Sequence, residues 1–154
     1  MKTFLKNFLI FCIGFTVYQT CEGIWKTFIS PGAAESFMMG LVGGTVTICI
    51  GLLNEKTFKW EWPIWIQVLI GTFYALVLEL ITGLILNKWL CPMLGKPLVW
   101  DYSDLPLNFY GLLCPQFIPA WVLLVIACIT VDDYIRYKVY GEEKPHYTWW
   151  WKKK

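Results

Sequence analysis

Four long apolar stretches constrain the fold of this chain more than any other feature of its sequence. They cover about residues 8–28, 35–53, 64–86 and 112–131. A helix of about 20 apolar residues is long enough to cross the hydrocarbon core of a bilayer, so each stretch predicts one transmembrane helix. The 154 residues are 57% hydrophobic and only 16% charged, which is typical of an integral membrane protein. We therefore expect an all-α, four-helix bundle that forms a single membrane domain over residues 1–154, with a cytoplasmic tail from residue 132.

The positively charged residues predict the orientation of the chain. Ten Lys or Arg residues lie at the N-terminus, between the second and third stretches, or after the fourth, whereas three lie on the other side. Because positive charge gathers on the cytoplasmic side, we expect a multi-pass protein of the cell membrane with both termini in the cytoplasm. Lys2 and Lys6 would also suit a signal peptide, but no small-x-small cleavage site follows the first apolar run.

Composition and motifs argue against several function classes. The six cysteines lack CxxC spacing and there is a single histidine, so we expect no metal site and no other cofactor. The chain has no Ser/His/Asp set and no HExxH motif, so we do not expect an enzyme; a membrane enzyme with a carboxylate base is a minor alternative. The net charge of +2 comes from lysines that flank the apolar stretches, so we expect no nucleic acid as a partner. A disulfide between Cys91 and Cys114 is left open.

Two acidic residues, Glu22 and Glu79, interrupt the first and third apolar stretches. A carboxylate in the hydrocarbon core costs several kcal/mol, so such residues usually face a bundle interior or a wet cavity. The two residues follow the starts of their stretches by similar lengths, and both stretches run outward in the expected orientation. We therefore expect both carboxylates at a similar depth in the outer half of the membrane.

Other polar residues are expected on the same side of the membrane. Tyr18 and Gln19 lie one helical turn before Glu22, and the long third connection adds further candidates for a substrate- or ion-binding site: Asp101, Tyr102, Asp104 and Asn108. Three roles for the glutamates remain open: ion pairs with Lys26 or Lys88, acceptance of hydrogen bonds from the connection, or a cation or proton site.

The connections and the second stretch carry further predictions. Small residues at 40, 44, 47 and 51 fall on one helical face, which indicates either packing within the bundle or a homodimer contact. Asp101 and Ser103 are residue types that bond their own backbone in tight turns, so the long connection could fold back as a re-entrant lid. Asp132 and Asp133 lie one turn before Arg136, which predicts a local ion pair.

Two motifs resemble a known family. Residues 79–83 read ELITG, residues 100–111 read WDYSDLPLNFYG, and Trp121 follows. Together they look like the ABC-transporter permease (type IV) family of small multi-span membrane proteins, and Glu22-Gly23-Ile24-Trp25 is similar to the glutamate in that family's first span. The Asn-Arg-Gly and Gly-Pro-x-x-Pro-x-Tyr-Gly elements expected after the first span are missing. The resemblance implies a membrane component of a transport system whose ATPase is a separate chain, since no GxxxxGK[ST] motif is present.

These observations favour a small transport or permease-like membrane protein with an intramembrane acidic site for a cation, a proton or a cationic group. The alternative is a non-transporting membrane subunit or scaffold that binds another membrane protein, in which the glutamates are structural. Besides the lipid bilayer, the expected partner is a second copy of the chain or another membrane chain, because four helices seldom enclose a path alone.

Overall fold

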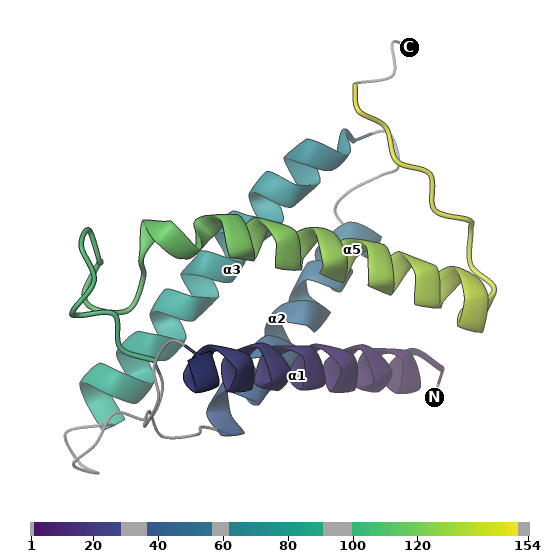
Figure 1. Ribbon diagram of the computed structural model, residues 1–154. Coiled ribbons are helices and arrows are strands. Elements are labelled where there is room, and N and C mark those ends of the chain that lie inside the picture. Colours follow the sequence, from purple (N-terminus) through teal and green to yellow (C-terminus); the bar gives the residue numbers. More distant parts are fainter. Residues whose placement is uncertain (1, 29–36, 57–61, 91–99, 151–154) are drawn as a thin grey trace.

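The computed structural model describes residues 2–28, 37–56, 62–90 and 100–150, and this part of the chain is helical with irregular connections (Figure 1). The long helices are α1 (Lys2–Phe28), α2 (Phe37–Lys56), α3 (Ile64–Gly83) and α5 (Ile118–Tyr140). A π-helix, η1 (Leu84–Leu90), extends α3, and a short 3-10 helix, η2 (Pro115–Phe117), leads into α5. The predicted all-α fold with four helices is confirmed.

Three helical segments within the described residues are long and apolar enough to cross a membrane. They are Thr3–Ile24 in α1, Ile64–Leu90 in α3 with η1, and Pro115–Tyr140 in η2 with α5. The apolar part of α2, Phe37–Leu53, is shorter. The chain is therefore a membrane protein, and lipid contact follows from the apolar residues that these helices expose.

The last helix begins and ends later than its apolar stretch. Residues 112–114 belong to the preceding connection and Pro115 opens η2. The following helix α5 begins at Ile118 with Pro119 in its first turn, where a residue without an N–H group is tolerated. At its other end α5 continues through the expected tail as far as Tyr140. Ion pairs one turn apart support these last turns, and Gly141, in the left-handed conformation with φ 69°, ends the helix.

The small residues of α2 bring it close to α1. A Cβ atom at Gly40 would lie 2.5 Å from the ring of Phe15, and one at Gly44 would lie 2.7 Å from the ring of Phe11. Only glycine leaves room for these rings, so the glycine face of α2 packs within the bundle, one of the two roles predicted for it.

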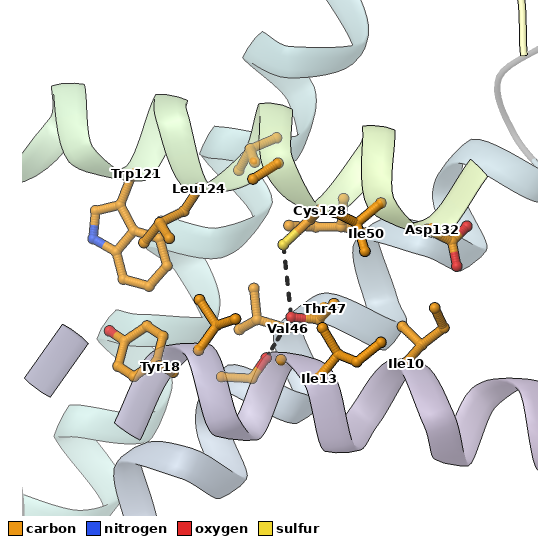
Figure 2. A pocket seen from close by; sticks show the side chains of 16 residues that line it. Ile10, Ile13, Tyr18, Val46, Thr47, Ile50, Trp121, Leu124, Cys128 and Asp132 are labelled. Atoms are coloured by element: carbon orange, nitrogen blue, oxygen red, sulfur yellow. Dashed lines mark hydrogen bonds between the residues drawn. The ribbon is translucent and has the colours of Figure 1, made fainter. Parts of the chain in front are cut away.

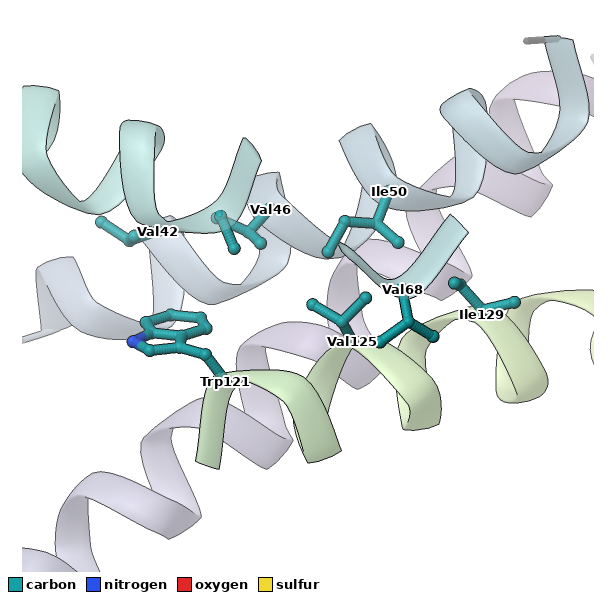
Figure 3. Packing of buried hydrophobic residues seen from close by; sticks show 8 residues of the cluster. Val42, Val46, Ile50, Val68, Trp121, Val125 and Ile129 are labelled. Carbon is teal, nitrogen blue, oxygen red and sulfur yellow. The ribbon is translucent and has the colours of Figure 1, made fainter. Parts of the chain in front are cut away.

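The apolar core lies between α2, α3 and α5 (Figure 3). Val46 and Ile50 of α2 face Val125 and Ile129 of α5, and Gly71 lets α3 approach Val125. The buried residues of α3 recur every three or four positions, from Gln67 through Ala75 and Glu79 to Gly83. The helical period therefore turns Glu79 toward the bundle and away from the lipid face.

Candidate functional site

Glu79 is enclosed by the bundle and lacks a counter-charge. Its exposed fraction is 2%. Its Oε1 atom accepts no hydrogen bond, and no ion pair to Glu79 is found within the described parts of the chain. An ion pair with Lys88, one of the three roles left open for the glutamates, is not found in the described part of the chain, and that lysine is exposed on η1. The Lys26 side chain lies outside the described residues.

Aromatic side chains from three segments surround the Glu79 carboxylate. The Trp121 indole of α5 interacts with the carboxylate directly. Tyr18 of α1 packs against that indole, with ring centroids 5.6 Å apart. Tyr102 approaches from the connection before η2, and its ring stacks on Phe117 at 4.8 Å. Two of the predicted site residues, Tyr18 and Tyr102, thus lie beside Glu79.

The charges that act on Tyr102 show that Glu22 and Glu79 lie at the same end of the bundle. Burial raises the pKa of the Tyr102 phenol, and the negative charges of Glu79, Cys114 and Glu22 raise it further. The phenol therefore stays protonated and can donate a hydrogen bond. Both glutamates also act electrostatically on Tyr18. The structure therefore brings Glu22, which is half-buried, to the same end of the bundle as Glu79.

Gln19, predicted to accompany Glu22, is half-buried on α1. Its Oε1 atom is buried and accepts no hydrogen bond from the described residues. After Glu79 Oε1, this amide oxygen is a second buried polar atom whose hydrogen-bonding capacity is unused among the described residues.

Two of the predicted loop residues hold the loop together. The Asp101 Oδ1 atom accepts hydrogen bonds from the backbone N–H of Ser103 at 2.9 Å and from its hydroxyl at 2.6 Å. Asn108 donates to the carbonyl of Leu105 at 2.7 Å and accepts from the N–H of Gly111 at 2.8 Å. These side chains replace backbone pairing in a segment that has no regular structure.

The third loop candidate, Asp104, is exposed. Leu107 and Tyr110, which are also exposed, have positive φ angles of 62° and 56°. The tip of the loop thus combines one exposed acid with two strained apolar residues.

The loop is fixed to the end of α3 by contacts that the sequence analysis did not identify. Asn87 of η1 donates to the carbonyl of Trp100 at 2.6 Å, and the Trp100 indole donates to the carbonyl of Leu112 at 2.7 Å. Leu112 is 1% exposed and packs on Gly83, where a Cβ atom would lie 2.8 Å from its Cδ2 atom. The Gly83 of the ELITG motif therefore serves the docking of the loop.

We call this end of the molecule the loop end; it comprises Glu22, Glu79 and residues 100–117. The opposite end holds a second group of charged residues, which we call the network end. Its members come from α1, α2, α5 and the following segment: Lys6, Glu55, Asp132, Asp133, Arg136 and Glu142.

Arg136 is the central cation of the network end. Its Nη1 atom lies 3.1 Å from Asp133 Oδ1 and 3.8 Å from Asp132 Oδ2, which confirms the predicted local ion pair. Its Nε atom lies 2.8 Å from Glu142 Oε2 and 3.5 Å from Glu55 Oε1. Burial acts to raise the pKa of Glu142, but the hydrogen bonds and positive charges of Arg136 and Lys6 together outweigh burial, and the pKa is lowered.

Long-range contacts of the network end were missed by sequence reasoning. Lys6 pairs with Glu55, which is 49 residues away, and with Glu142 Oε1 at 3.5 Å. The Tyr147 hydroxyl donates to Asp133 Oδ2 at 2.8 Å. No local spacing marks such pairs, since their members lie between 14 and 136 residues apart.

The cysteines and other candidate ligands add no metal centre to these sites. In the regions that the structure covers, no group of three or more His, Cys, Asp or Glu residues could hold a metal ion. Cys114 is a buried free thiol, and its Sγ atom lies 3.2 Å from Gln116 Oε1. Cys91 lies outside the described residues.

A comparison with known families covers almost the whole chain. A family model described as "Putative ABC-transporter type IV" matches residues 4–151. This match confirms the resemblance drawn from residues 79–83 and 100–111. No solved structure matches the chain.

Proposed function

We propose, for a chain that belongs to the family described as "Putative ABC-transporter type IV", that Glu79 is the centre of an intramembrane acidic site for a cation, a proton or a cationic group. With its membrane-spanning helices the chain is a transport-related membrane protein. In the proposed site, Glu22 adds a second negative charge at the loop end.

The observation that carries the proposal is the unpaired, buried carboxylate of Glu79. It is 2% exposed, and its Oε1 atom accepts no hydrogen bond from the described residues. A buried carboxylate without a counter-charge is unfavourable unless it is neutralised. A bound proton or cation would provide that neutralisation, and a reversible occupant of this kind suits transport.

The neighbouring aromatic rings suit a positively charged occupant. The rings of Tyr18 and Trp121 lie near the carboxylate, and aromatic rings can attract cations. The protonated phenol of Tyr102 can donate a hydrogen bond to the carboxylate when the occupant leaves. These residues come from α1, α5 and the loop, so movement of any one segment would change the affinity of the site.

The docked loop is proposed to control access to this site. Asn87, Trp100 and Leu112 fix it at the end of α3. Asp104 lies exposed on it and would attract positive charge toward the loop end. Under this proposal Asp101 and Asn108 maintain the shape of the loop and do not bind the transported species.

A complete transport path requires more than this one chain. Only three helical segments among the described residues are long enough to span, and such a bundle seldom encloses a path. We propose that the chain works as a homo-oligomer or with another membrane chain, and that any ATPase is a separate subunit. Cross-linking in the native membrane, followed by mass spectrometry, would identify the neighbouring chains.

Transport measurements on three variants test the proposed site. The fluxes of protons, alkali cations and organic cations are measured in cells or vesicles containing wild-type protein, E79Q, E22Q or E143Q. Glu143 is an exposed glutamate beyond α5, so E143Q removes one negative charge, as E79Q does, but leaves the loop end unchanged. We expect E79Q to lower at least one flux about tenfold or more, E22Q to lower it less, and E143Q to leave it unchanged.

The same variants distinguish transport from a scaffold role. If the glutamates only support assembly, E79Q would reduce the recovery of a co-purifying membrane protein or the amount of folded protein, with no change in flux per molecule. An E79Q protein that is folded, present at the wild-type level and unaltered in every flux would overturn the proposal.

A further inference from the structure

A cavity of about 70 Å³ lies between α1, α2 and α5 (Figure 2). Its walls are apolar, with Ile10 and Ile13 of α1, Val46 of α2 and Leu124 of α5 among them. Near its middle the Thr47 hydroxyl lies 3.6 Å from the Cys128 thiol and 2.8 Å from the Gly43 carbonyl, so these polar groups already have partners.

The two ends of the cavity differ in chemistry. At one end lie Tyr18 and Trp121, which are also the neighbours of Glu79. At the other end Asp132 presents a carboxylate (Figure 2). Asp132 is 3% exposed, and its Oδ2 atom accepts no hydrogen bond from any residue that the structure describes. The cavity therefore ends at a buried acceptor whose capacity is unused.

The surroundings of Asp132 leave negative charge uncompensated. Its nearest cation is Arg136 at 3.8 Å, but this guanidinium lies closer to Asp133 and to Glu142. Lys6 of α1 forms ion pairs with Glu55 of α2 and with Glu142. When all are ionised, the four carboxylates of the network end exceed its two cations by two charges. Among the described residues, Cys128 and Tyr147 are further titratable groups that face Asp132 or its partners.

A glycine makes room for this carboxylate. A Cβ atom at Gly51 of α2 would lie 3.0 Å from both Cγ and Oδ1 of Asp132, and 3.1 Å from Oδ2. Because Gly51 has no side chain, α2 at this position neither blocks Asp132 nor offers it a side-chain hydrogen-bond donor.

We propose that Asp132 is the charged anchor of a second binding site, which takes the ammonium group of an organic amine whose alkyl chain lies in the apolar cavity. The carboxylate accepts hydrogen bonds from the ammonium, and the surplus negative charge of the network end attracts it. The site goes beyond the proposed role of Glu79 and does not depend on it.

The apolar walls of the cavity and the negative charge around Asp132 both favour an alkylammonium ligand. An inorganic cation would lose its water in the cavity and would meet apolar walls, with one carboxylate as its main ligand. A phospholipid head group would bring a phosphate close to four carboxylates. One water molecule takes up about 10–15 Å³ of such cavity space. The cavity of about 70 Å³ therefore accommodates a chain of roughly five heavy atoms. Ala127 and Val131 line it and are exposed, so a longer chain can extend outward.

Calorimetric titration with n-hexylammonium tests the site. The full chain in detergent micelles is titrated at pH 7 as wild type, D132N and E143Q, with hexan-1-ol as an uncharged probe of the same chain length. We expect D132N to weaken binding of n-hexylammonium about 10- to 100-fold, because a charge-assisted contact is lost. E143Q makes the same charge change at an exposed residue outside the cavity and outside the network end, and is expected to alter the affinity less than threefold. Hexan-1-ol should bind wild type and D132N equally.

Two further variants keep the test decisive. A127L places a larger side chain at the open side of the cavity and should weaken binding while Asp132 is intact, so it carries the test if D132N does not fold. E79Q should bind n-hexylammonium as wild type does, even if it abolishes transport, which separates this site from the proposed function. Equal affinity of wild type and folded D132N, unchanged binding by A127L, or displacement of n-hexylammonium by an equal concentration of K⁺ would each overturn the proposal.

Discussion

The two ends of the bundle use carboxylates in opposite ways. At the network end, Glu55, Asp133 and Glu142 each lie within 3.5 Å of a positively charged nitrogen. At the loop end, Glu79 is as deeply buried as Asp133, at 2% each, but has no such partner among the described residues. The same burial therefore supports a fixed ion-pair network at one end and leaves an unneutralised group at the other.

This contrast shows that burial alone does not reveal the role of an acid in a membrane protein. A buried ion pair is satisfied and resists change, because removal of one partner leaves the other charge uncompensated. An unpaired acid is available to an exchangeable occupant. Asp132 combines both situations, since it belongs to the network but keeps one oxygen without a hydrogen bond.

The largest effect on stability is expected from Arg136→Met. The change leaves the carboxylates of Asp133 and Glu55 without their guanidinium and should lower the free energy of unfolding by about 3–5 kcal/mol. Denaturant unfolding in detergent, followed by circular dichroism, measures the loss. Lys138→Met is the control, because Lys138 is exposed on the same helix and contacts only Tyr rings in the described region. Equal losses in the two variants would contradict the proposed importance of the network.

The second-largest loss of stability is expected from Gly111→Ala at the loop end. Gly111 has φ 68°, and an added Cβ atom would lie 2.4 Å from Ser103 Oγ and 3.0 Å from Asp101 Oδ1. Strain and overpacking together should cost about 2–3 kcal/mol. Gly141→Ala is a matched control, since Gly141 has φ 69° but open space around it, so only the conformational cost of about 1 kcal/mol applies. Unfolding of both variants, with limited proteolysis of the loop, would show whether packing distinguishes them.

A smaller effect is expected from Tyr147→Phe at the network end. The change removes the hydrogen bond to Asp133 and should lower the free energy of unfolding by about 1–2 kcal/mol. Burial and the hydrogen bond to Asp133 raise the pKa of the Tyr147 phenol. Its contribution is therefore fully present below the unfolded pKa of about 10 and is lost as the pH rises above it.

The pH dependence provides the check on this interpretation. Unfolding of wild type and Y147F should differ at pH 8, and the difference should shrink between pH 10 and pH 11. A difference that stays constant through this range would mean that the phenol is not held protonated by the fold.

The smallest effect on stability is expected from Glu79→Gln at the loop end. A neutral amide of similar shape removes an unpaired buried carboxylate, so the free energy of unfolding should stay within about 1 kcal/mol of wild type or increase. Thermal unfolding of the variant beside R136M tests the comparison directly. A loss as large as that of R136M would show that Glu79 has a stabilising partner and would remove the distinction between the two ends.

Much of the loop end could be predicted from local sequence. The burial of Glu79 follows from an acid on the interior face of an apolar helix, and Asp101 with Ser103 predicted a tight turn. The roles within the loop were less accessible. Asp101 and Asn108 were predicted as binding residues from their side of the membrane, and that role stays a prediction. Their hydrogen bonds within the loop could not be foreseen in the same detail.

The contacts between residues far apart in the chain could not be predicted from the sequence. Lys6 was interpreted as a sign of orientation, and its pairing with Glu55 depends on how α1 packs against α2. Asn87 gave no signal that it would hold Trp100, since its donor geometry exists only when η1 and the loop are in place. Pairs of this kind have no periodicity, so only a folded chain brings them together.

The sequence by itself determined that this chain is an all-α membrane protein, where its helices lie, and that an acid sits on an interior face, because these depend on hydrophobicity and helical period. Only the tertiary structure decided which acids meet a cation. That outcome depends on side chains that approach from different helices within about 4 Å, and electrostatic compensation at such distances is set by packing and not by order along the chain.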